Sequence, residues 1–450
     1  MRLKAPTLAT AIALALTGSP VSATDLLQAY TQARQSDPAL AISESQNAIQ
    51  QEGVVQSRAN LLPQLNGSIG LSRSESEGTL ANNTTFSSTS TSRRKSLNLN
   101  QSLFNWGNYN RLSGSKARAE QSDAELASAN NALITRVAEA YFNVLTAIDT
   151  LAASRAEERA VKRQLDQAEK RLEVGLAPIT DVHEAKARYD SSRANSILAG
   201  NALYDAREAL AEITGQPALD MRGLPDTYLP KNETLRSTEE WVQQALDSNP
   251  AVKARSLALQ AAEDDIASAK AAHLPTLDGS ISYGDSSLLS GAAGPFSTTD
   301  SNATTYGITL NIPLFAGLAT QSRVKQAVAN RDIASEQLEQ SKRSVIRQVR
   351  NADRTLVAGL AEVEARRLAV VSAKSALEAG EVGLEVGTRT IVDVLLAQQQ
   401  LFTATREYSR ARHNYLVNTL RLKQAAGALD VADLEAINGL LSQNAEAKIQ

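Results

Sequence analysis

Four short stretches of the chain alternate apolar residues with small polar ones, the period of a β-strand that has one apolar face. In the clearest stretch, 305–315, every second position is apolar: Tyr306, Ile308, Leu310, Ile312 and Leu314. The same alternation predicts strands at about 64–73, 95–105 and 276–284. The segments inside the two strand pairs, about 73–94 and 285–304, are rich in Ser, Thr, Gly and Asn and predict long exposed loops.

A different period follows each strand pair. The stretches 108–174 and 318–386 contain no proline and carry an apolar stripe every seven residues, as in Val137, Val144 and Leu151. At about 1.5 Å per residue, such a helix would be roughly 100 Å long, and a sustained heptad predicts a left-handed supercoil. Shorter helices are expected at about 178–212 and 390–426. A simple coiled-coil dimer is the alternative, but it does not explain the strands.

The chain also repeats itself. Pro38 and Pro250 are 212 positions apart, and the same offset relates Pro63 to Pro275 and Gly175 to Gly387. A constant offset over separate landmarks predicts two structural repeats, 24–230 and 231–430, followed by a tail at 431–450. We expect this tail, which is polar at its end, to be mobile, and we assign it no role.

The strand pattern raises the question of what covers the apolar face. Lipid outside and water inside a barrel would suit it, and so would an amphipathic sheet on a soluble core. Four strands cannot close a barrel, because single-chain barrels begin at about eight. If these strands enter a membrane, several chains must share one barrel. Arg93, Arg94 and Lys95 would then meet lipid phosphates at the outer rim, or form an ordinary solvated charge run.

Composition narrows the classes of protein. The net charge of −3 argues against nucleic-acid binding, and the absence of cysteine excludes disulfides and thiolate chemistry. Residues 1–23 have the basic, apolar and small-residue regions of a cleaved signal peptide. No later apolar run reaches the length of about 20 residues that a spanning helix needs.

The sequence gives little sign of catalytic chemistry. The three histidines, His183, His273 and His413, are scattered, and we expect each at the surface or at an interface. No phosphate-binding loop or catalytic triad motif is evident, so we expect no enzyme, no cofactor and no metal site.

Several motifs carry a family resemblance. The run Gly387-Thr388-Arg389-Thr390-Ile391-Val392-Asp393-Val394, its partner at 175–182, and the segments 140–145 and 313–317 resemble the TolC family over about 24–430. The resemblance implies a homotrimer with a shared twelve-stranded outer-membrane β-barrel, four strands per chain, continued by an α-helical barrel in the periplasm. It also implies docking on a periplasmic adaptor (membrane fusion) protein and an inner-membrane pump or ABC secretion transporter.

The resemblance further implies a closed aperture at the helical tips. Asp393 matches an acidic ring, while Arg389, Thr180 and Asp181 match polar links that hold the coils shut. Asp181 and Asp393 also stand early in helices, where the dipole alone favours a carboxylate. The chain departs from the family pattern at three positions where aspartate, tyrosine and glutamine are expected, namely Leu396, Leu384 and Lys170.

The turns between the long helices are implied to contact the adaptor. They comprise Val174, Gly175 and Leu176 in the first repeat and Val386, Gly387 and Thr388 in the second. The glycines also permit a tight turn on purely structural grounds.

The expected function is therefore an outer-membrane exit duct for multidrug efflux or type I secretion. The alternative is a structural coiled-coil protein of the periplasm or cell surface. The sequence does not identify the cargo, the pump or the adaptor.

Overall fold

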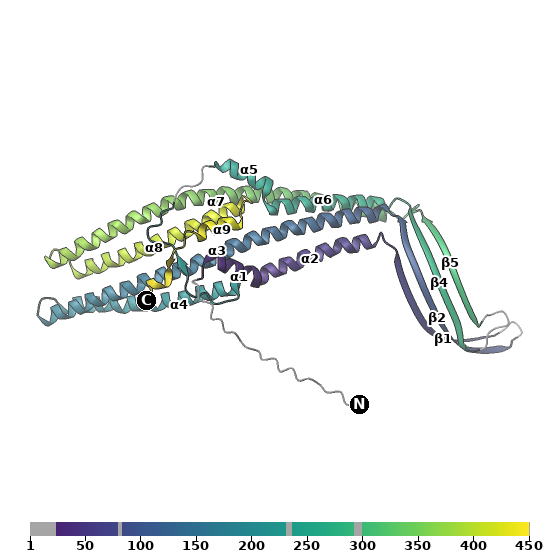
Figure 1. The fold of residues 1–450 in the computed structure, drawn as a ribbon, viewed down its shortest axis with the longest axis horizontal. Coiled ribbons are helices and arrows are strands. Elements are labelled where there is room, and N and C mark those ends of the chain that lie inside the picture. The colour runs from purple at the N-terminus through teal and green to yellow at the C-terminus, as the bar shows by residue number, and fades with distance from the viewer. Residues whose placement is uncertain (1–23, 80–82, 231–235, 292–298, 450) are drawn as a thin grey trace, which may run out of the picture.

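The computed structural model describes residues 24–79, 83–230, 236–291 and 299–449, so the expected signal peptide at 1–23 lies outside the described residues. The molecule is elongated, with one sheet at one end and paired helical tips at the other (Figure 1). The first half comprises α1 (Leu26–Ser36), α2 (Pro38–Ala59), β1 (Gln64–Thr79), β2 (Thr85–Phe104), α3 (Trp106–Glu173), α4 (Ile179–Thr214) and β3 (Arg222–Gly223). The second half comprises α5 (Thr238–Ser248), α6 (Pro250–Ala271), β4 (Thr276–Ser290), β5 (Asp300–Asn311), α7 (Ala319–Glu385), α8 (Ile391–Ala425), α9 (Val431–Asn438), β6 (Gln443–Asn444) and η1 (Ala445–Lys448).

Equivalent helices in the two halves begin in the same way. Asp37 caps α2 by accepting a hydrogen bond from the Leu40 amide at 2.8 Å, and Asn249 caps α6 by accepting one from the Ala251 amide at 2.9 Å. A proline follows each cap, at the helix position where its missing N–H costs nothing. The polar cap and proline therefore explain why each of these helices starts where it does.

Two helices run the length of the helical part. α3 has 68 residues and α7 has 67, and both extend from the sheet to the tips (Figure 1). Towards the sheet, α3 packs against α2 and α6, and α6 packs against α7; towards the tips, α3 packs against α4 and α8, and α7 packs against α8. The expected heptad positions Val137, Val144 and Leu151 are buried in these contacts.

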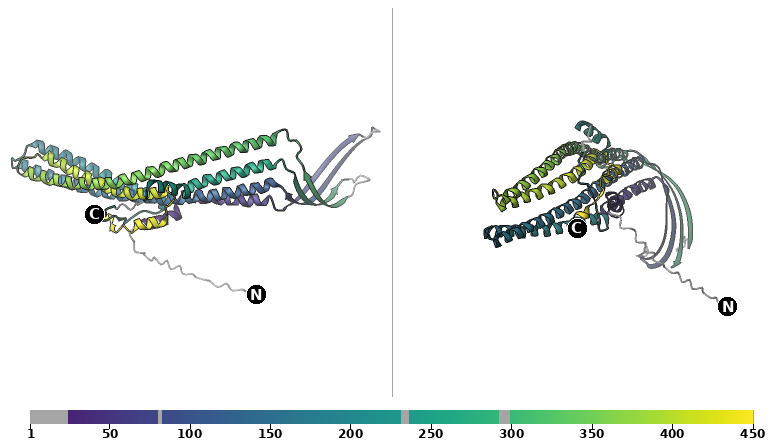
Figure 2. Two further views of the ribbon diagram at one scale, coloured as in Figure 1. Left: turned by 90° about the horizontal axis from the view of Figure 1, so that it is seen from above. Right: turned by 60° about the vertical axis from the view of Figure 1, so that its left-hand side comes forward.

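One antiparallel sheet with the strand order β1-β2-β4-β5 joins the two halves. Its register aligns Leu65, Leu99, Ile281 and Tyr306 in a single row across the four strands. The neighbouring row contains Asn66, Asn98, Ser282 and Thr305. Adjacent rows point to opposite faces, so one face of the sheet is apolar and the other is polar. The four strands form one curved layer (Figure 2).

The strands extend farther than expected from the sequence. β1 continues to Thr79, β2 begins at Thr85 and β4 continues to Ser290, so much of the two expected loops is strand. The β1–β2 register continues through this extension, from Ser74 opposite Ser90 to Thr79 opposite Thr85. Serine pairs also link the two strands, with hydroxyl–hydroxyl distances of 2.8 Å for Ser68 and Ser96 and 2.9 Å for Ser72 and Ser92. β5 ends at Asn311, before Pro313, which has no N–H for strand pairing.

A central hub surrounds the middle of the long helices. Its large buried side chains include Tyr141, Phe142 and Ile148 of α3, with Leu420 of α8 and Leu26 of α1. The helices α1 and α9 gather with the C-terminus on one side of the long helices (Figure 2). Among the described residues, no helix is long and apolar enough to cross a membrane.

The expectation of a mobile tail was wrong for its described part. Leu434, Ile437 and Leu441 are buried in the hub, and the Ala445 amide donates to the Met221 carbonyl at 2.9 Å. The three apolar side chains recur at helical spacing, so they anchor α9 although the last residues are polar.

Candidate functional site

The two helical tips have the same turn geometry. Gly175 and Gly387 both have φ of +76°, the left-handed conformation that favours glycine. At the first tip the Leu176 amide donates to the Arg171 carbonyl at 2.7 Å, and at the second the Thr388 amide donates to the Gly383 carbonyl at 2.8 Å. These are the hydrogen bonds of a Schellman motif, which ends a helix by satisfying its last carbonyls. The tips are therefore rigid turns.

Both turns present apolar side chains at the end of the molecule. Val174, Leu176 and Val386 are exposed, whereas Thr388 turns its hydroxyl back to the Gly383 carbonyl at 3.2 Å. Exposed apolar residues on a rigid turn are suited to contact with a partner protein.

The second tip leads into α8 through a capping box. The Thr390 amide donates to the Asp393 carboxylate at 3.0 Å, and the Asp393 amide donates to the Thr390 hydroxyl at 3.3 Å. The Thr390 amide, then the Thr390 hydroxyl and then the Arg389 charge lower the pKa of Asp393. The carboxylate therefore stays ionised and is held at the start of its own helix.

The first tip lacks this arrangement. Pro178 stands at the position equivalent to Thr390, and no side chain caps α4. Within the described residues, the Asp181 carboxylate has no hydrogen bond or ion pair, and none joins Arg389 to Thr180 or Asp181. In a single chain, the structure thus places Arg389 beside Asp393 and leaves Thr180 and Asp181 apart from them on the other tip.

Sequence reasoning missed Gly383, a buried glycine one turn before the second tip. Its carbonyl accepts hydrogen bonds from the Thr388 and Arg389 amides, at 2.8 and 3.1 Å. A Cβ atom at this position would lie 2.7 Å from Cγ of Arg389. Only glycine therefore lets the Arg389 side chain fold back over α7.

A separate apolar cluster joins the two coils near the tips. Ile391 and Leu395 of α8 belong to one buried cluster with side chains of α3 and α4, namely Val161, Leu165, Ala168 and Ala185. Leu384, which stands where the family resemblance predicts a tyrosine, packs against this cluster. Arg188 of α4 adds a hydrogen bond to Gln399 of α8 at 3.1 Å.

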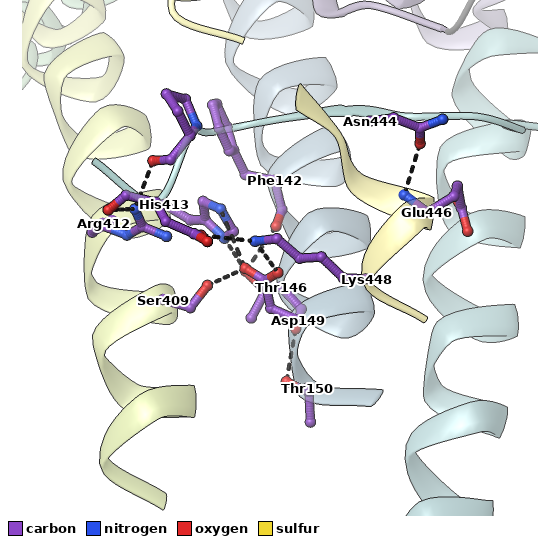
Figure 3. Close-up of polar contacts among 12 residues, drawn as sticks. Phe142, Thr146, Asp149, Thr150, Ser409, Arg412, His413, Asn444, Glu446 and Lys448 are labelled. Carbon is purple, nitrogen blue, oxygen red and sulfur yellow. Dashed lines mark hydrogen bonds and ion pairs between the residues drawn. The ribbon is translucent and has the colours of Figure 1, made fainter. Parts of the chain in front are cut away.

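A buried polar cluster in the hub contains Ser409, His413 and Asp149 (Figure 3). The Ser409 hydroxyl donates to the Asp149 carboxylate, while His413 Nδ1 contacts the Thr146 hydroxyl at 2.9 Å. In a catalytic triad the histidine stands between the serine and the aspartate. Here the Ser409 hydroxyl donates to Asp149 directly and His413 is 2% exposed, so the arrangement is that of a structural contact between α3 and α8. We call Thr146, Asp149, Ser409 and His413 the hub polar cluster.

The hub polar cluster also binds Lys448, near the end of the described chain. Lys448 Nζ lies 2.9 Å from Asp149 Oδ1 (Figure 3). Burial by itself would raise the pKa of Asp149, but Lys448, His413 and the Ser409 hydroxyl together outweigh it and leave that pKa below its usual value. Burial lowers the pKa of His413 to about 4, against the opposing effect of Asp149, so the imidazole is neutral near pH 7. The expectation that His413 lies at the surface or at an interface between chains was wrong.

The matches to known proteins cover both helical tips and the strands of the sheet. The family described as "Outer membrane efflux protein" matches residues 29–216 and 241–428, two segments that are also 212 positions apart. "Outer membrane protein TolC" of Vibrio cholerae is 38% identical over 428 residues, covering 95% of this chain and 96% of its relative. "Alkaline protease secretion protein AprF" of Pseudomonas aeruginosa is 29% identical, covering 92% and 86%. The outer membrane protein VceC of Vibrio cholerae, at 20% identity, has a similar fold with a TM-score of 0.75, covering 90% of this chain and 96% of that chain.

Proposed function

This chain belongs to the outer membrane efflux protein family, and from that membership we propose that three copies of it assemble into one continuous exit duct. As an outer-membrane channel protein extending into the periplasm, it serves efflux and type I secretion. The finer proposal is that the homotrimer shares a twelve-stranded barrel and that a periplasmic adaptor and an inner-membrane pump or ABC transporter supply the cargo.

The unpaired edges of the sheet support the proposal that several copies of this chain share one barrel. β1 and β5 are the outer strands of the four, and each presents one row of backbone groups that its own chain leaves unpaired. In lipid, an unpaired edge costs several kcal/mol per backbone group. Ile69 of β1 and Ile308 of β5 are 78% and 75% exposed, as expected for edge strands that meet another copy and face lipid.

The helical part has matching edges. α2 on one side and α7 on the other expose apolar side chains, among them Ile49 and Val55 of α2 with Ile333 and Val357 of α7. If β5 of one copy pairs with β1 of the next, α7 and α2 of the same two copies are brought together. One arrangement therefore covers the edges of both the sheet and the helical layer.

At the tips we propose the closed aperture, with Asp393 as an acidic ring and Arg389, Thr180 and Asp181 as links between coils. The free carboxylate of Asp181 supports a link role, because it has no partner within the described part of its own chain. The apolar cluster of Ile391 and Leu395 supports an additional, non-polar hold on α8. Since Leu384 stands where a polar link residue is expected and itself packs against this cluster, we propose that the cluster restrains α8 in the closed state.

We assign the tips a second role as the adaptor contact. Val174, Gly175 and Leu176, with Val386, Gly387 and Thr388, form the two rigid turns at the end of the molecule. A bulky residue at Gly175 or Gly387 should impair export while trimers still form. Normal export by such variants would remove this assignment.

The decisive experiment is single-channel conductance of the detergent-purified protein in a planar bilayer. Asp393→Asn removes the charge but retains an oxygen that accepts the Thr390 amide, whereas Asp393→Ala removes both. We expect both variants to lose cation preference, because a ring of carboxylates on a narrow axis favours cations. Asp181→Asn makes the same change at the first tip; because Asp181 is proposed as a link and not as part of the ring, this variant should retain cation preference.

The outcomes separate the parts of the proposal. A stable channel whose selectivity ignores Asp393 would retain the duct and reject the acidic ring. If selectivity changes in Asp393→Ala alone, the capping box matters and the charge does not. Protein that never conducts and needs no detergent would reject the duct and favour a structural coiled coil.

A further inference from the structure

The strand register separates the three consecutive cations at 93–95. Lys95 lies opposite Ile69 of β1 and Asp285 of β4, and Arg93 lies opposite Leu71 and Ser287. Both therefore share the apolar face with Leu97 and Leu99. Arg94, between them, belongs to the polar face, because successive side chains of a strand point to opposite sides.

The two cations stand at the far end of the apolar band. They lie nine and eleven residues before Phe104, the last residue of β2 at the junction with the helices. At about 3.3 Å per residue and a tilt of about 40°, this places them roughly 23–28 Å above that junction. The apolar band of an outer-membrane protein is about 25 Å tall, so both reach the level of the outer headgroups.

Their charges are unequally neutralised. Lys95 Nζ lies 3.6 Å from the Asp285 carboxylate, and nearby Arg73 pairs with Glu75 at 2.8 Å. Arg93 has no ion pair within the described residues, and its buried Nε atom lacks a hydrogen-bond partner. Within the described residues Arg93 is thus a cation at the outer end of the apolar face without a carboxylate partner, while Asp300 of β5 lies in the same row, two strands away.

An apolar groove lies below these cations on the same face. It has a volume of about 600 Å³, and its lining includes Leu99, Leu103, Gly279, Ile281, Tyr306 and Ile308. Gly279 lies in the lining of the groove, where a Cβ atom would make an ordinary contact with Leu103 at 3.4 Å and a larger side chain would extend into the groove. Leu99, at one end of the groove, is only four residues from Lys95, about 13 Å along the strand.

We propose that Arg93 and Lys95 together with this groove form a binding site for a phosphorylated lipid of the outer leaflet. The cations hold the phosphate, and an acyl chain lies in the groove below. This inference rests on the proposed function, because it requires the apolar face to be in contact with lipid. Free phosphate would use the cations alone and leave the groove empty, whereas a lipid uses both.

The test measures lipid bound to the full chain, purified in detergent, by native mass spectrometry. The probes are bis-phosphorylated lipid A, the same lipid without its phosphates, and inorganic phosphate. We expect Arg93→Ala/Lys95→Ala to weaken lipid A binding roughly tenfold, since each cation near a charged lipid surface contributes appreciably. Arg94→Ala is the matched control and should bind like the wild type. A second variant, Gly279→Leu, fills the groove and should weaken binding of the lipid with or without phosphates.

Each outcome is informative. Equal binding by the wild type and Arg93→Ala/Lys95→Ala would overturn the proposal, and so would an equal loss in Arg94→Ala. Inorganic phosphate binding as well as lipid A would show an anion site and overturn the lipid assignment. Conductance is measured on the same samples: channels that conduct but bind lipid A independently of these residues reject only the lipid site, whereas absence of any channel rejects the proposed function itself.

Discussion

Equivalent residues in the two repeats make different contacts. Asp181 and Asp393 occupy matching positions, yet Asp393 is held in a capping box by Thr390, and Asp181 stands free because Pro178 replaces the capping threonine. Arg171 and Gly383 form another such pair, and only the glycine allows Arg389 to fold back. At the residue scale, the two repeats share one turn geometry, and the different residues at 178 and 390 and at 171 and 383 make the tips chemically distinct.

The Gly383 arrangement predicts a specific weakness. Gly383→Ala places a Cβ atom within 2.7 Å of Arg389 Cγ, so the arginine must move out. Overpacking of this kind costs about 1–2 kcal/mol, and trypsin should cleave after Arg389 roughly tenfold faster. Gly380→Ala is the control, since its Cβ would lie 3.9 Å from Val394, an ordinary contact. Equal cleavage of the two variants would contradict the role assigned to Gly383.

The hub histidine predicts a pH dependence of stability. The folded state lowers the pKa of His413 to about 4, so at pH 4 to 6.5 the unfolded chain binds the proton more readily. Stability should be constant above about pH 6.5 and fall with decreasing pH. Each pH unit costs at most about 1.4 kcal/mol. Asp149 acts in the same direction at still lower pH, because its pKa is lowered.

The measurement is urea unfolding at pH 7.5 and 5.0. Between these values the wild type should lose about 2 kcal/mol more than His413→Gln, in which the titrating group is absent. His183 and His273 are common to both proteins and cancel in the comparison. An equal loss in the two proteins would show that His413 is not the source.

Residue roles were the hardest to predict from sequence. The pattern around Asp393 identified the tip, but the burial of His413 depends on Asp149, 264 positions earlier in the chain, and on Lys448 near its end. Likewise, nothing local to Gly383 shows that Arg389 packs over it. Contacts made between distant segments leave no periodic signal, so only the structure reveals them.

At the scale of elements, the period of apolar residues predicted the helices closely and the strands less well. The long helices were expected at 108–174 and 318–386, and they span Trp106–Glu173 and Ala319–Glu385. A heptad pattern extends over many helical turns, so it predicts the two ends of the helix closely. The outer parts of the strands are rich in Ser and Thr and place charged residues such as Glu75, Arg93 and Asp285 on the otherwise apolar face, so the apolar alternation stops before the hydrogen-bonded ladder does.

The packing of α8 on the neighbouring coil gives an element-scale prediction. Leu395 is 3% exposed within the apolar cluster, and the adjacent Leu396 is 47% exposed. Leu395→Ala should cost about 2–4 kcal/mol in urea unfolding, and Leu396→Ala less than about 0.5 kcal/mol. If the cluster also holds the aperture shut, Leu395→Ala alone should raise the conductance. Similar effects of the two variants would show that α8 is held by other contacts.

At the scale of the whole molecule, the two edges of the sheet predict the assembly. The chain has no cysteine, so introduced cysteines report single contacts. A cysteine at Ser68 of β1 and one at Thr305 of β5 should cross-link different copies, with neighbouring positions on β1 scanned to find the register. We expect products up to the trimer and none larger on non-reducing gels.

The matched control uses two inner strands. Asn98 of β2 and Ser282 of β4 are partners within one chain, so cysteines at these positions should give only internally linked monomer. Cross-linked products larger than a trimer would contradict a closed assembly of three. Absence of any product between β1 and β5 throughout the scan would contradict pairing of these edges.

The constant offset of 212 residues made the global arrangement accessible from sequence, because two copies of one unit imply two equivalent sets of elements. It was also predictable that the sheet of one chain has two unpaired edge strands, since four strands are too few to close a barrel. The hub was not: α1, α9 and η1 are short, and their positions depend on packing against both repeats at once.

The hub joins the first and the last described segments of the chain. The Leu26 amide donates to the Asn438 side chain at 3.0 Å, and Lys448 reaches Asp149. In a chain exported from its N-terminus, these contacts therefore form only after residues 438–448 have crossed the inner membrane. Until then, chaperones of the periplasm would meet a molecule whose long helices already exist but whose first and last described segments are still apart. We therefore expect the contacts of residues 438–448 to be among the last parts of the hub to form.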